Sequence, residues 1–500
     1  MSYTRYKKIG NKEYAYEITA YWDKEKKYSR QKAKYLGIVI DKEAGIFRKV
    51  KRRNRDENGK IIRNSRNVRE KFIEKEIVSF GSSYLIDKVI SNDDIGKIFT
   101  DLLSDKQLTT LKSLLSFRLI NNSAMYLAKD WYEGDIAKYL FFDAKIRSGA
   151  ISEFLEDFGS EKLQKEFFKR YLPIATKDNK EGLIIDGTAM PNDINIPINE
   201  FGYNEGSVDK QIKFLSVISA DNNMPLYFRY NSGSIADVST INNTIKELKA
   251  NNANSKSVLL DAGFYSNDNI KLLQDNNIDF IIRLPKGRNL FKDLTNDIKQ
   301  DQLESLANAV KVSKKRVVFI QEKKCHINKK DVYAYIILDP KKKADLSSNY
   351  LADILDDNNN DIDDIDNQKI TEKLKSKGIF VILSSKKQKK NEILDIYYSR
   401  QKVERLFAFS KSDLNLLPLR THKESTLRGY LFLLFLLSYF FMKIHKKLKK
   451  KFTIEQSFII LSSLKAKIYE NQILIQEANK KQKIIFELIG HQIPEEIARE

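Results

Sequence analysis

Residues 183–188 read LIIDGT and residues 258–263 read VLLDAG, so an apolar run is twice followed directly by an aspartate. Such runs predict short buried strands that end at Asp186 and at Asp261. In α/β sheets, side chains at the carboxyl ends of strands emerge from the core, and active sites gather there. A single aspartate at a strand end is more often a turn or helix cap. The two together are candidate catalytic residues.

The elements around these runs predict a mixed α/β sheet. Strands are expected over 213–220, 225–230 and 280–284, and helices over 237–248 and 267–273. Three consecutive strands followed by alternating helix and strand is a mixed α/β order. Asp237 is a rival ligand to Asp261, but its position favours a cap of its own helix.

A long helix is predicted from about Asn391 to Leu414. At about 100° per residue, Tyr397, Arg400, Glu404 and Lys411 fall within roughly a 60° arc, so these four side chains share one face. A phenol, a guanidinium, a carboxylate and an ammonium group are unusual in a protein core. On periodicity alone, an exposed network of salt bridges fits them as well.

The charge of the chain predicts a polyanionic partner. Lys and Arg number 88 against 67 Asp and Glu, an excess of +21, and nucleic acid is the commonest partner of such a protein. Residues 1–80 hold 23 basic and 11 acidic residues, with strands expected over Tyr14–Trp22 and Tyr35–Ile40. The basic segment Lys49–Arg69 is either a solvated loop or a DNA-contacting arm.

Other features narrow the class. With Cys325 as the single cysteine and four histidines at no ligand spacing, an internal disulfide and a structural zinc site are excluded. The polar first ten residues predict no signal peptide and a cytoplasmic protein, associated with the nucleoid if it binds DNA. The apolar run Tyr430–Met442 has 13 residues, too few for a spanning helix, so a buried helix and no membrane are expected.

The remaining segments are assigned from their composition and hydrophobic periodicity. Ser104 and Gln107 form a predicted capping box within a helical region, a helix is expected near Ile454–Ile475, and a basic tail follows it. The Asp- and Asn-rich stretch Asp353–Asp366 is expected as a solvated acidic loop. These patterns divide the chain into a basic β-rich segment (1–80), a helical segment (81–178), a mixed α/β segment in two parts (179–290 and 386–425), a β-rich insertion between them (291–385) and a C-terminal helical segment (426–500).

Tyr397, Arg400, Glu404 and Lys411 match the pattern Y-x2-R-x3-E-x6-K. The chain thereby resembles DDE transposases of bacterial insertion sequences, specifically the insertion-sequence-four family. The strings IDGT (185–188) and LDAGFY (260–265) are also similar to patterns of that family. The similarity covers about residues 180 to 440.

The resemblance implies an α/β fold with a ribonuclease H-like core, a mixed five-stranded sheet with helices that a β-rich insertion interrupts. It implies that Asp186, Asp261 and Glu404 hold two Mg2+ ions, which Mn2+ can replace, and catalyse DNA cleavage and strand transfer. Arg400 and Lys411 would contact DNA, and Tyr397 would either contact the DNA backbone or position the metal site. The resemblance also implies that the segments 1–80 and 81–178 bind DNA, that 179–290 and 386–425 form the catalytic core around the insertion 291–385, and that 426–500 mediates dimerisation. The implied partners are the inverted-repeat ends of the element, the target duplex, and a second copy of the chain in a homodimer.

Two other functions remain open at this point. A nuclease of the ribonuclease H superfamily would cleave DNA but not join it, and a decayed transposase would bind DNA as a repressor without cutting. The presence of all three carboxylates favours an active enzyme.

Overall fold

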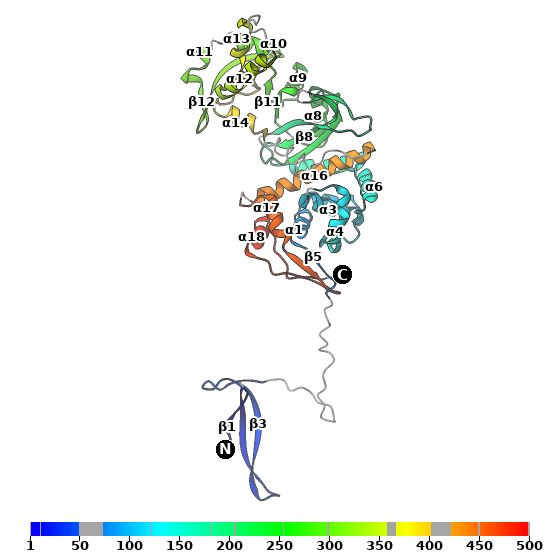
Figure 1. Ribbon diagram of the computed structural model, residues 1–500, viewed down its shortest axis with the longest axis vertical. Helices are drawn as coiled ribbons and strands as arrows, with labels where there is room; N and C mark the ends of the chain where they lie inside the picture. Colours follow the sequence, from blue (N-terminus) through cyan, green and yellow to red (C-terminus); the bar gives the residue numbers. More distant parts are fainter. Residues whose placement is uncertain are drawn as a thin grey trace. The chain divides into compact units, whose positions relative to one another are not determined.

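The computed structural model describes residues 2–10, 12–49, 74–121, 123–180, 182–204, 207–253, 255–296, 298, 300–357, 367–401, 422–448 and 451–498. The chain divides into two compact units, Met1–Ile73 and Glu74–Glu500, which are described separately (Figure 1). The first boundary therefore lies a few residues before the one expected at residue 80.

The first unit is a four-stranded antiparallel sheet. Its strands, in the order β1-β2-β3-β4, are β1 (Ser2–Ile9), β2 (Lys12–Asp23), β3 (Tyr28–Asp41) and β4 (Ile46–Arg48). The strands expected over Tyr14–Trp22 and Tyr35–Ile40 are thus present within β2 and β3. Apart from Lys49, the predicted arm Lys49–Arg69 lies outside the described residues.

Five strands of the second unit form the mixed sheet expected from the sequence. They are β6 (Leu183–Pro191), β8 (Ser207–Ser219), β9 (Pro225–Ser232), β10 (Ser257–Leu260) and β11 (Asp279–Leu284). Their order is β9-β8-β6-β10-β11; β10 runs parallel to both neighbours, and β8 runs antiparallel to both of its own. The helices α8 (Ile241–Ala250) and α9 (Asn267–Asp275) connect β9 to β10 and β10 to β11.

The sheet has ten strands rather than five, because the insertion adds to it. Strand β15 (Ile379–Ser384) pairs antiparallel with β11, and β14 (Lys330–Leu338), β13 (Arg316–Ile327) and β12 (Ala309–Ser313) follow outward. Strand β7 (Glu200–Asn204) completes it on β8. Because β14 is buried from Ala334 to Leu338 and β15 from Phe380 to Ser384, these strands prolong the core of the sheet instead of forming a separate module.

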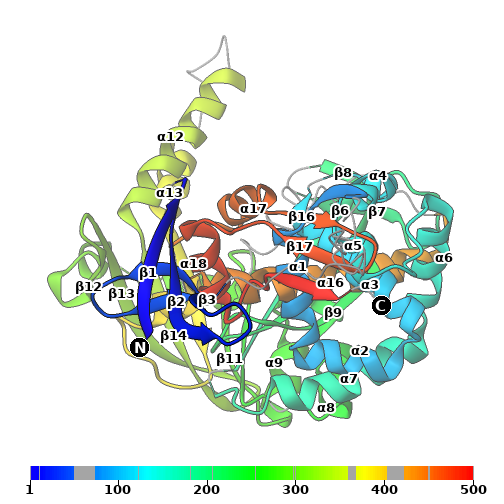
Figure 2. The same ribbon diagram turned by 90° about the horizontal axis from the view of Figure 1, so that it is seen from below.

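The insertion is also more helical than predicted. It contains α10 (Asn289–Asn296), α11 (Gln300–Leu303), α12 (Pro340–Asp357) and α13 (Asn367–Ser376), and Figure 2 shows α12 projecting from the rest of its unit. The first part of the expected acidic loop, residues 353–357, is the last turn of α12. Residues 358–366 lie outside the described residues.

Helices precede the sheet, as expected. They are α1 (Gly81–Ser91), α2 (Asp94–Leu102), α3 (Asp105–Ile120), α4 (Ala128–Glu133), α5 (Ala137–Leu140), α6 (Ser148–Phe158) and α7 (Glu161–Ala175). The capping box of Ser104 and Gln107 at the start of α3 is confirmed.

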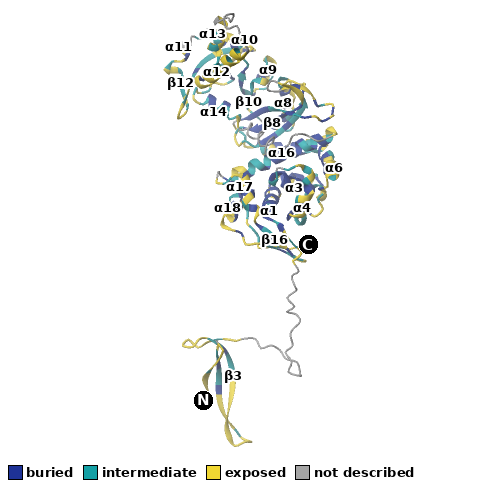
Figure 3. Ribbon diagram, viewed as in Figure 1, coloured by how far each residue is buried: buried dark blue, intermediate teal, exposed yellow. Residues whose placement is uncertain are grey.

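The apolar run Tyr430–Met442 lies in α16 (Glu424–Lys447), a core helix. By length and composition α16 is the one described helix that could cross a membrane, yet 67% of its most apolar window is buried. Phe432 of α16 stacks on Phe158 of α6 at 4.6 Å between ring centroids. Figure 3 shows the burial continuing through the neighbouring helices and the sheet. Packing within the unit therefore accounts for its apolar surface.

The C-terminal segment differs from the expected separate helical domain. After α17 (Ile454–Ser462), the residues expected to continue the helix form β16 (Lys465–Ile468) and β17 (Gln472–Ile475). These pair with β18 (Glu496–Ala498) and with β5 (Glu76–Ser79) from the start of the unit. The expected basic tail is the capped helix α18 (Lys480–Ile489). Both ends of the second unit thus share one small sheet.

Asp135, which is buried beside β5, makes the stability of the folded chain depend on pH. Burial raises the pKa of Asp135 from 3.8 to about 6, although the nearby Ser83 hydroxyl, the hydrogen bond from the Ala137 N–H and the charge of Lys465 oppose the shift. The folded chain therefore binds this proton more tightly than the unfolded chain. The associated stability is present below about pH 4 and is lost as the pH rises toward 6, on the order of 3 kcal/mol.

Asp135→Asn is accordingly expected to stabilise the protein at pH 8 relative to the parent, with the difference vanishing near pH 4. Asparagine keeps an acceptor for the Ala137 N–H but carries no charge to desolvate. Thermal unfolding midpoints measured from pH 4 to 8 check this, with the exposed Asp130→Asn as the control. A difference that does not change with pH would show that ionisation of Asp135 has no effect on stability.

Candidate active site

Register across three parallel strands brings the two predicted aspartates together. Ile185 of β6 aligns with Leu260 of β10, so the next residues, Asp186 and Asp261, lie side by side. Neighbouring strands are about 4.8 Å apart, and aligned side chains share a face. Asp186 is not at the end of its strand as predicted, because β6 continues to Pro191 along β8. Asp186 follows the last residue of β6 that pairs with β10, so the edge of β6 that faces β10 is unpaired from this residue onward.

Arg400 links the two carboxylates. Its Nη1 lies 3.2 Å from Asp186 Oδ1 and 3.5 Å from Asp261 Oδ2, so these two oxygens are at most 6.7 Å apart, the sum of the two distances. Asp186 is 5% exposed, and two negative charges at such a site repel each other unless a cation lies between them. The guanidinium provides that charge.

Tyr397 holds the second aspartate. Its hydroxyl donates to Asp261 Oδ1 at 3.0 Å, and the side chain is only 3% exposed. Burial, followed by the charge of Asp261, raises the pKa of Tyr397 well above its ordinary value, so the hydroxyl remains a donor at neutral pH. Of the two roles expected of Tyr397, the hydrogen bond to Asp261 favours positioning of the carboxylate over a contact with the DNA backbone.

The predicted long helix is only partly described. It begins as α14 (Ile393–Tyr398), whose Ile393, Leu394 and Tyr397 are buried, and Arg400 lies in the turn that follows. The side chains of Tyr397 and Arg400, three residues apart, both reach the aspartates, as the shared face predicts. Glu404 and Lys411 lie outside the described residues.

Arg283 is a further member of the site that sequence reasoning missed. Leu260 aligns with Ile282 of β11, so Arg283 continues the row formed by Asp186 and Asp261. Its charge is near enough to oppose the pKa shift of Tyr397. The signal was the alternation in DFIIRL (279–284), where Phe280, Ile282 and Leu284 are buried and Arg283 faces the other side.

Asp237 lies on the opposite face of the sheet. A Cβ on Gly187 would come 3.7 Å from Asp237 Oδ1, and Gly187 and Asp186 point to opposite sides of β6. Its carboxylate pairs with Lys213 at 3.4 Å. The N-cap of α8 is Thr240, so the expected capping role of Asp237 is wrong, although its exclusion from the carboxylate pair agrees with the geometry.

The residues present fit a divalent cation. Carboxylate oxygens are the ligands that Mg2+ and Mn2+ prefer, and Asp186 and Asp261 already share one positive group. Among the described residues, which omit Glu404, no group of three His, Cys, Asp or Glu could hold a metal ion. The pair therefore needs a further ligand from elsewhere in the chain to complete such a site.

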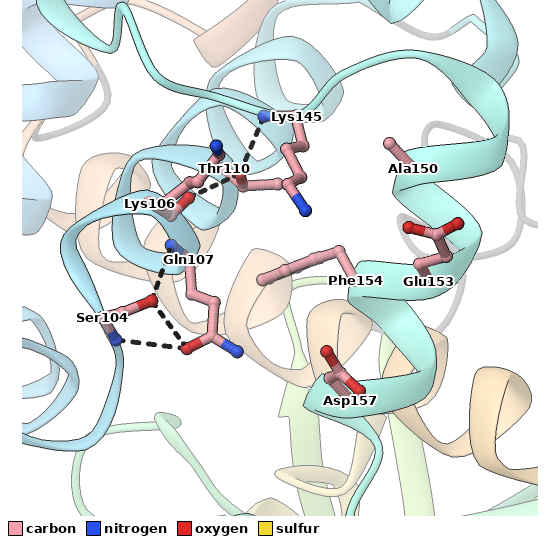
Figure 4. Close-up of a pocket in the computed structure, with 9 residues that line it drawn as sticks. All are labelled: Ser104, Lys106, Gln107, Thr110, Lys145, Ala150, Glu153, Phe154 and Asp157. Atoms are coloured by element: carbon pink, nitrogen blue, oxygen red, sulfur yellow. Dashed lines mark hydrogen bonds between the residues drawn. The ribbon is translucent and has the colours of Figure 1, made fainter.

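A cavity of about 270 Å³ between α3 and α6 is not part of this site (Figure 4). Lys106 and Lys145 are balanced there by Glu153 and Asp157. Its polar groups are used internally, because Ser104 and Gln107 cap α3 and Thr110 accepts from the Lys145 N–H at 2.9 Å. Its lining therefore stabilises the packing of the two helices.

Comparisons with known proteins identify the family of the chain. Residues 177–441, slightly more than half of the chain, match the family model of the transposase DDE domain. A chain of the cryo-EM structure of the piggyBac transposase synaptic complex with hairpin DNA is similar at 11% identity and a TM-score of 0.40, covering 82% of this chain and 79% of that one. No curated protein matches. The chain belongs to the transposase DDE domain family and is a DDE-type DNA transposase.

Proposed function

We propose that this transposase binds the inverted-repeat ends of an insertion sequence, cleaves the DNA there and joins the freed ends to a target. The observation that carries the proposal is the alignment of Asp186 with Asp261 under one guanidinium, inside the segment that matches the family. Ribonuclease H-like topology and membership of the insertion-sequence-four family belong to the same proposal. The order β9-β8-β6-β10-β11 and the Y-x2-R-x3-E-x6-K pattern support them.

Transposase DDE domains use divalent metal ions. We assign Asp186, Asp261 and Glu404 as the ligands of two Mg2+ ions, for which Mn2+ can substitute. Bound there, the ions would stabilise the attacking and leaving oxygens of an in-line phosphoryl displacement. Asp186 pairs with Ser216 of β8, the preceding Ile185 pairs with Leu260 of β10, and Tyr397 fixes the orientation of Asp261. The protein thus presents its oxygen donors in a fixed arrangement.

Arg400 and Arg283 supply positive charge on the same face. Arg400 is held between the carboxylates, and a guanidinium there can turn to a DNA phosphate once a cation takes over the aspartates. Lys411 is assigned to the same role from the sequence pattern. Assembly of two copies on two element ends is proposed from the family resemblance, with duplex DNA as the partner.

The function is tested with full-length protein, a duplex carrying the inverted repeats that flank its gene, and a supercoiled target plasmid. Cleavage that requires Mg2+ or Mn2+, together with joined product, is the expected result. Metal-dependent cleavage without joining would identify a nuclease instead. A gel shift without cleavage in either metal would identify a DNA-binding repressor.

Tyr397→Phe is expected to reduce the cleavage rate about 10- to 100-fold while the affinity for DNA changes little. The variant keeps the packing of the ring but removes the hydroxyl that orients Asp261. Single-turnover cleavage with saturating DNA measures the rate, and Mn2+ titration measures the weaker metal binding that should accompany it. Tyr398→Phe, on the neighbouring ring, serves as the matched control. Equal losses in the two variants would contradict a positioning role for Tyr397.

A further inference from the structure

The hairpin of β2 and β3 extends beyond the strand beside it. The described residues of β1 pair with β2 only as far as Thr19, whereas β2 and β3 continue to pair from Ala20 with Gln31 to Asp23 with Tyr28. Residues 20–31 therefore form a two-stranded ribbon. Such a ribbon is marginally stable by itself, which makes it a suitable element to lie against a partner.

The tip of the ribbon is ordered by its own side chains. Asp23 accepts hydrogen bonds from the N–H groups of Glu25 and Lys26, each at 3.1 Å, and pairs with Arg30 at 3.0 Å. Lys27 takes a positive φ of 48°, which closes the turn. The lysines at positions 24, 26 and 27 are consequently held on a defined turn and are exposed.

Large aromatic side chains surround these lysines without being buried. Trp22 is 64% exposed, Tyr28 51% and Tyr21 46%. Because Trp22 and Tyr21 are adjacent in a strand, they point to opposite faces of the ribbon. Among the described apolar residues of this unit, only Ala15 and Ile18 are buried, as the teal and yellow sheet in Figure 3 illustrates. Tyr14 and Tyr16 pack on Tyr35 within the unit, whereas the aromatic side chains of the ribbon remain exposed.

Charge indicates what covers this surface. Residues 2–10 and 12–49 contain 13 Lys and Arg against 6 Asp and Glu, an excess of seven. A second copy of so basic a sheet would be repelled, whereas a polyanion would be attracted. Duplex DNA also matches the shape, because its major groove, about 12 Å wide, admits a two-stranded β-ribbon.

We propose that the ribbon of residues 20–31 inserts into the major groove of duplex DNA. Its tip lysines contact phosphates on the two sides of the groove, and Trp22 lies against base edges. This inference rests on the proposed function, since it specifies how the transposase holds its substrate. It assigns duplex binding to a surface in the first unit, separate from the carboxylate site.

The tryptophan content of the chain allows a direct test. Trp22 and Trp131 are the two tryptophans, and Trp131 packs on Phe117 at 5.5 Å between ring centroids in the second unit. In the full-length Trp131→Phe protein, emission reports Trp22 alone. Titration with a fluorescein-labelled 40-bp duplex of random sequence should raise the anisotropy and, at the same DNA concentrations, quench Trp22 and lower its acrylamide quenching constant at least twofold.

The outcomes separate this inference from the proposed function. An anisotropy rise with unchanged Trp22 emission would overturn ribbon insertion and leave DNA binding intact. No anisotropy rise at low salt would contradict DNA binding itself and the ribbon with it. Tighter binding to the single strand than to the duplex would overturn groove insertion, as would displacement by distamycin, a minor-groove ligand, but not by methyl green, a major-groove ligand.

Charge variants provide the second measurement. Replacing Lys24, Lys26 and Lys27 together by glutamine should weaken duplex binding at least tenfold and reduce the salt slope by about two to three. The matched control replaces Lys7, Lys8 and Lys12, which are also exposed and lie at the other end of β2, roughly 35 Å from the tip at 3.3 Å per residue. Equal losses in the two triple variants would overturn a specific role for the ribbon.

Discussion

Asp186→Asn and Asp261→Asn are each expected to reduce DNA cleavage and strand transfer by at least about 10³-fold while leaving the affinity for duplex DNA within a fewfold of the parent. Asparagine matches the shape of aspartate but removes the charge on which a divalent cation depends. Asp186 is buried in the sheet and Asp261 is fixed by Tyr397, so no neighbouring carboxylate among the described residues can take their place.

The matched control for these variants is Asp237→Asn. Asp237 lies in the same part of the sheet but across it, against Gly187 and paired with Lys213. Its replacement should leave the cleavage rate within about threefold of the parent. Cleavage and gel-shift assays on the same preparations separate catalysis from binding. A loss in Asp237→Asn as large as that in Asp186→Asn would mean that general negative charge, not the aligned pair, supports activity.

Of the variants considered, Gly429→Ala is expected to lower the free energy of unfolding most, by about 3 kcal/mol or more. Gly429 of α16 and Gly159 at the end of α6 meet where the two helices touch backbone to backbone. A Cβ on Gly429 would overlap the carbonyl oxygen of Leu155, and one on Gly159 would overlap that of Ser425. Since neither carbonyl is the flexible end of a side chain, α16 would have to move away from α6.

Gly149→Ala in α6 provides the comparison. A Cβ there meets nothing within 4 Å, and alanine in a helix is favoured over glycine by roughly 0.5–1 kcal/mol. Thermal unfolding of the two variants should therefore shift in opposite directions. A Gly429→Ala protein that unfolds at the parent's temperature would show that the two helices do not pack as closely as the structure places them.

The sequence was sufficient for the sheet around the aspartates because local signals were strong there. LIID and VLLD are apolar runs with abrupt polar ends, and the elements between residues 213 and 284 came in the observed order. Membership of a DDE transposase family also followed from the sequence and is confirmed by the family match.

Strands whose pairing partners lie far away in the sequence could not be predicted from local sequence patterns. Strand β15 joins β11 across roughly 100 residues, and β16 pairs with β5 from the other end of the unit. In Lys465–Ile468 the alternation of Ala466 and Ile468 with lysines is only four residues long, so it was read as part of the helix before it. Long-range partners, not intrinsic preference, decide such segments.

Within the site, sequence periodicity placed Tyr397 and Arg400 on one face but could not give their contacts. The sequence left Tyr397 either at the DNA backbone or at the metal site, and its hydroxyl donates to Asp261. The place of Arg283 beside the aspartates follows only from the register of β10 with β11. The roles of Glu404 and Lys411 stay predictions, since neither residue is described.

The most direct test of the account is Mn2+ binding followed by electron paramagnetic resonance, with full-length protein and a duplex of the element end. The parent is predicted to bind two Mn2+ ions per chain at the aspartate pair, and Asp186→Asn, Asp261→Asn and Glu404→Gln should each lose at least one of them, whereas Asp237→Asn should retain both. Undiminished Mn2+ binding in Asp186→Asn or in Glu404→Gln would contradict the claim that these carboxylates form one metal site.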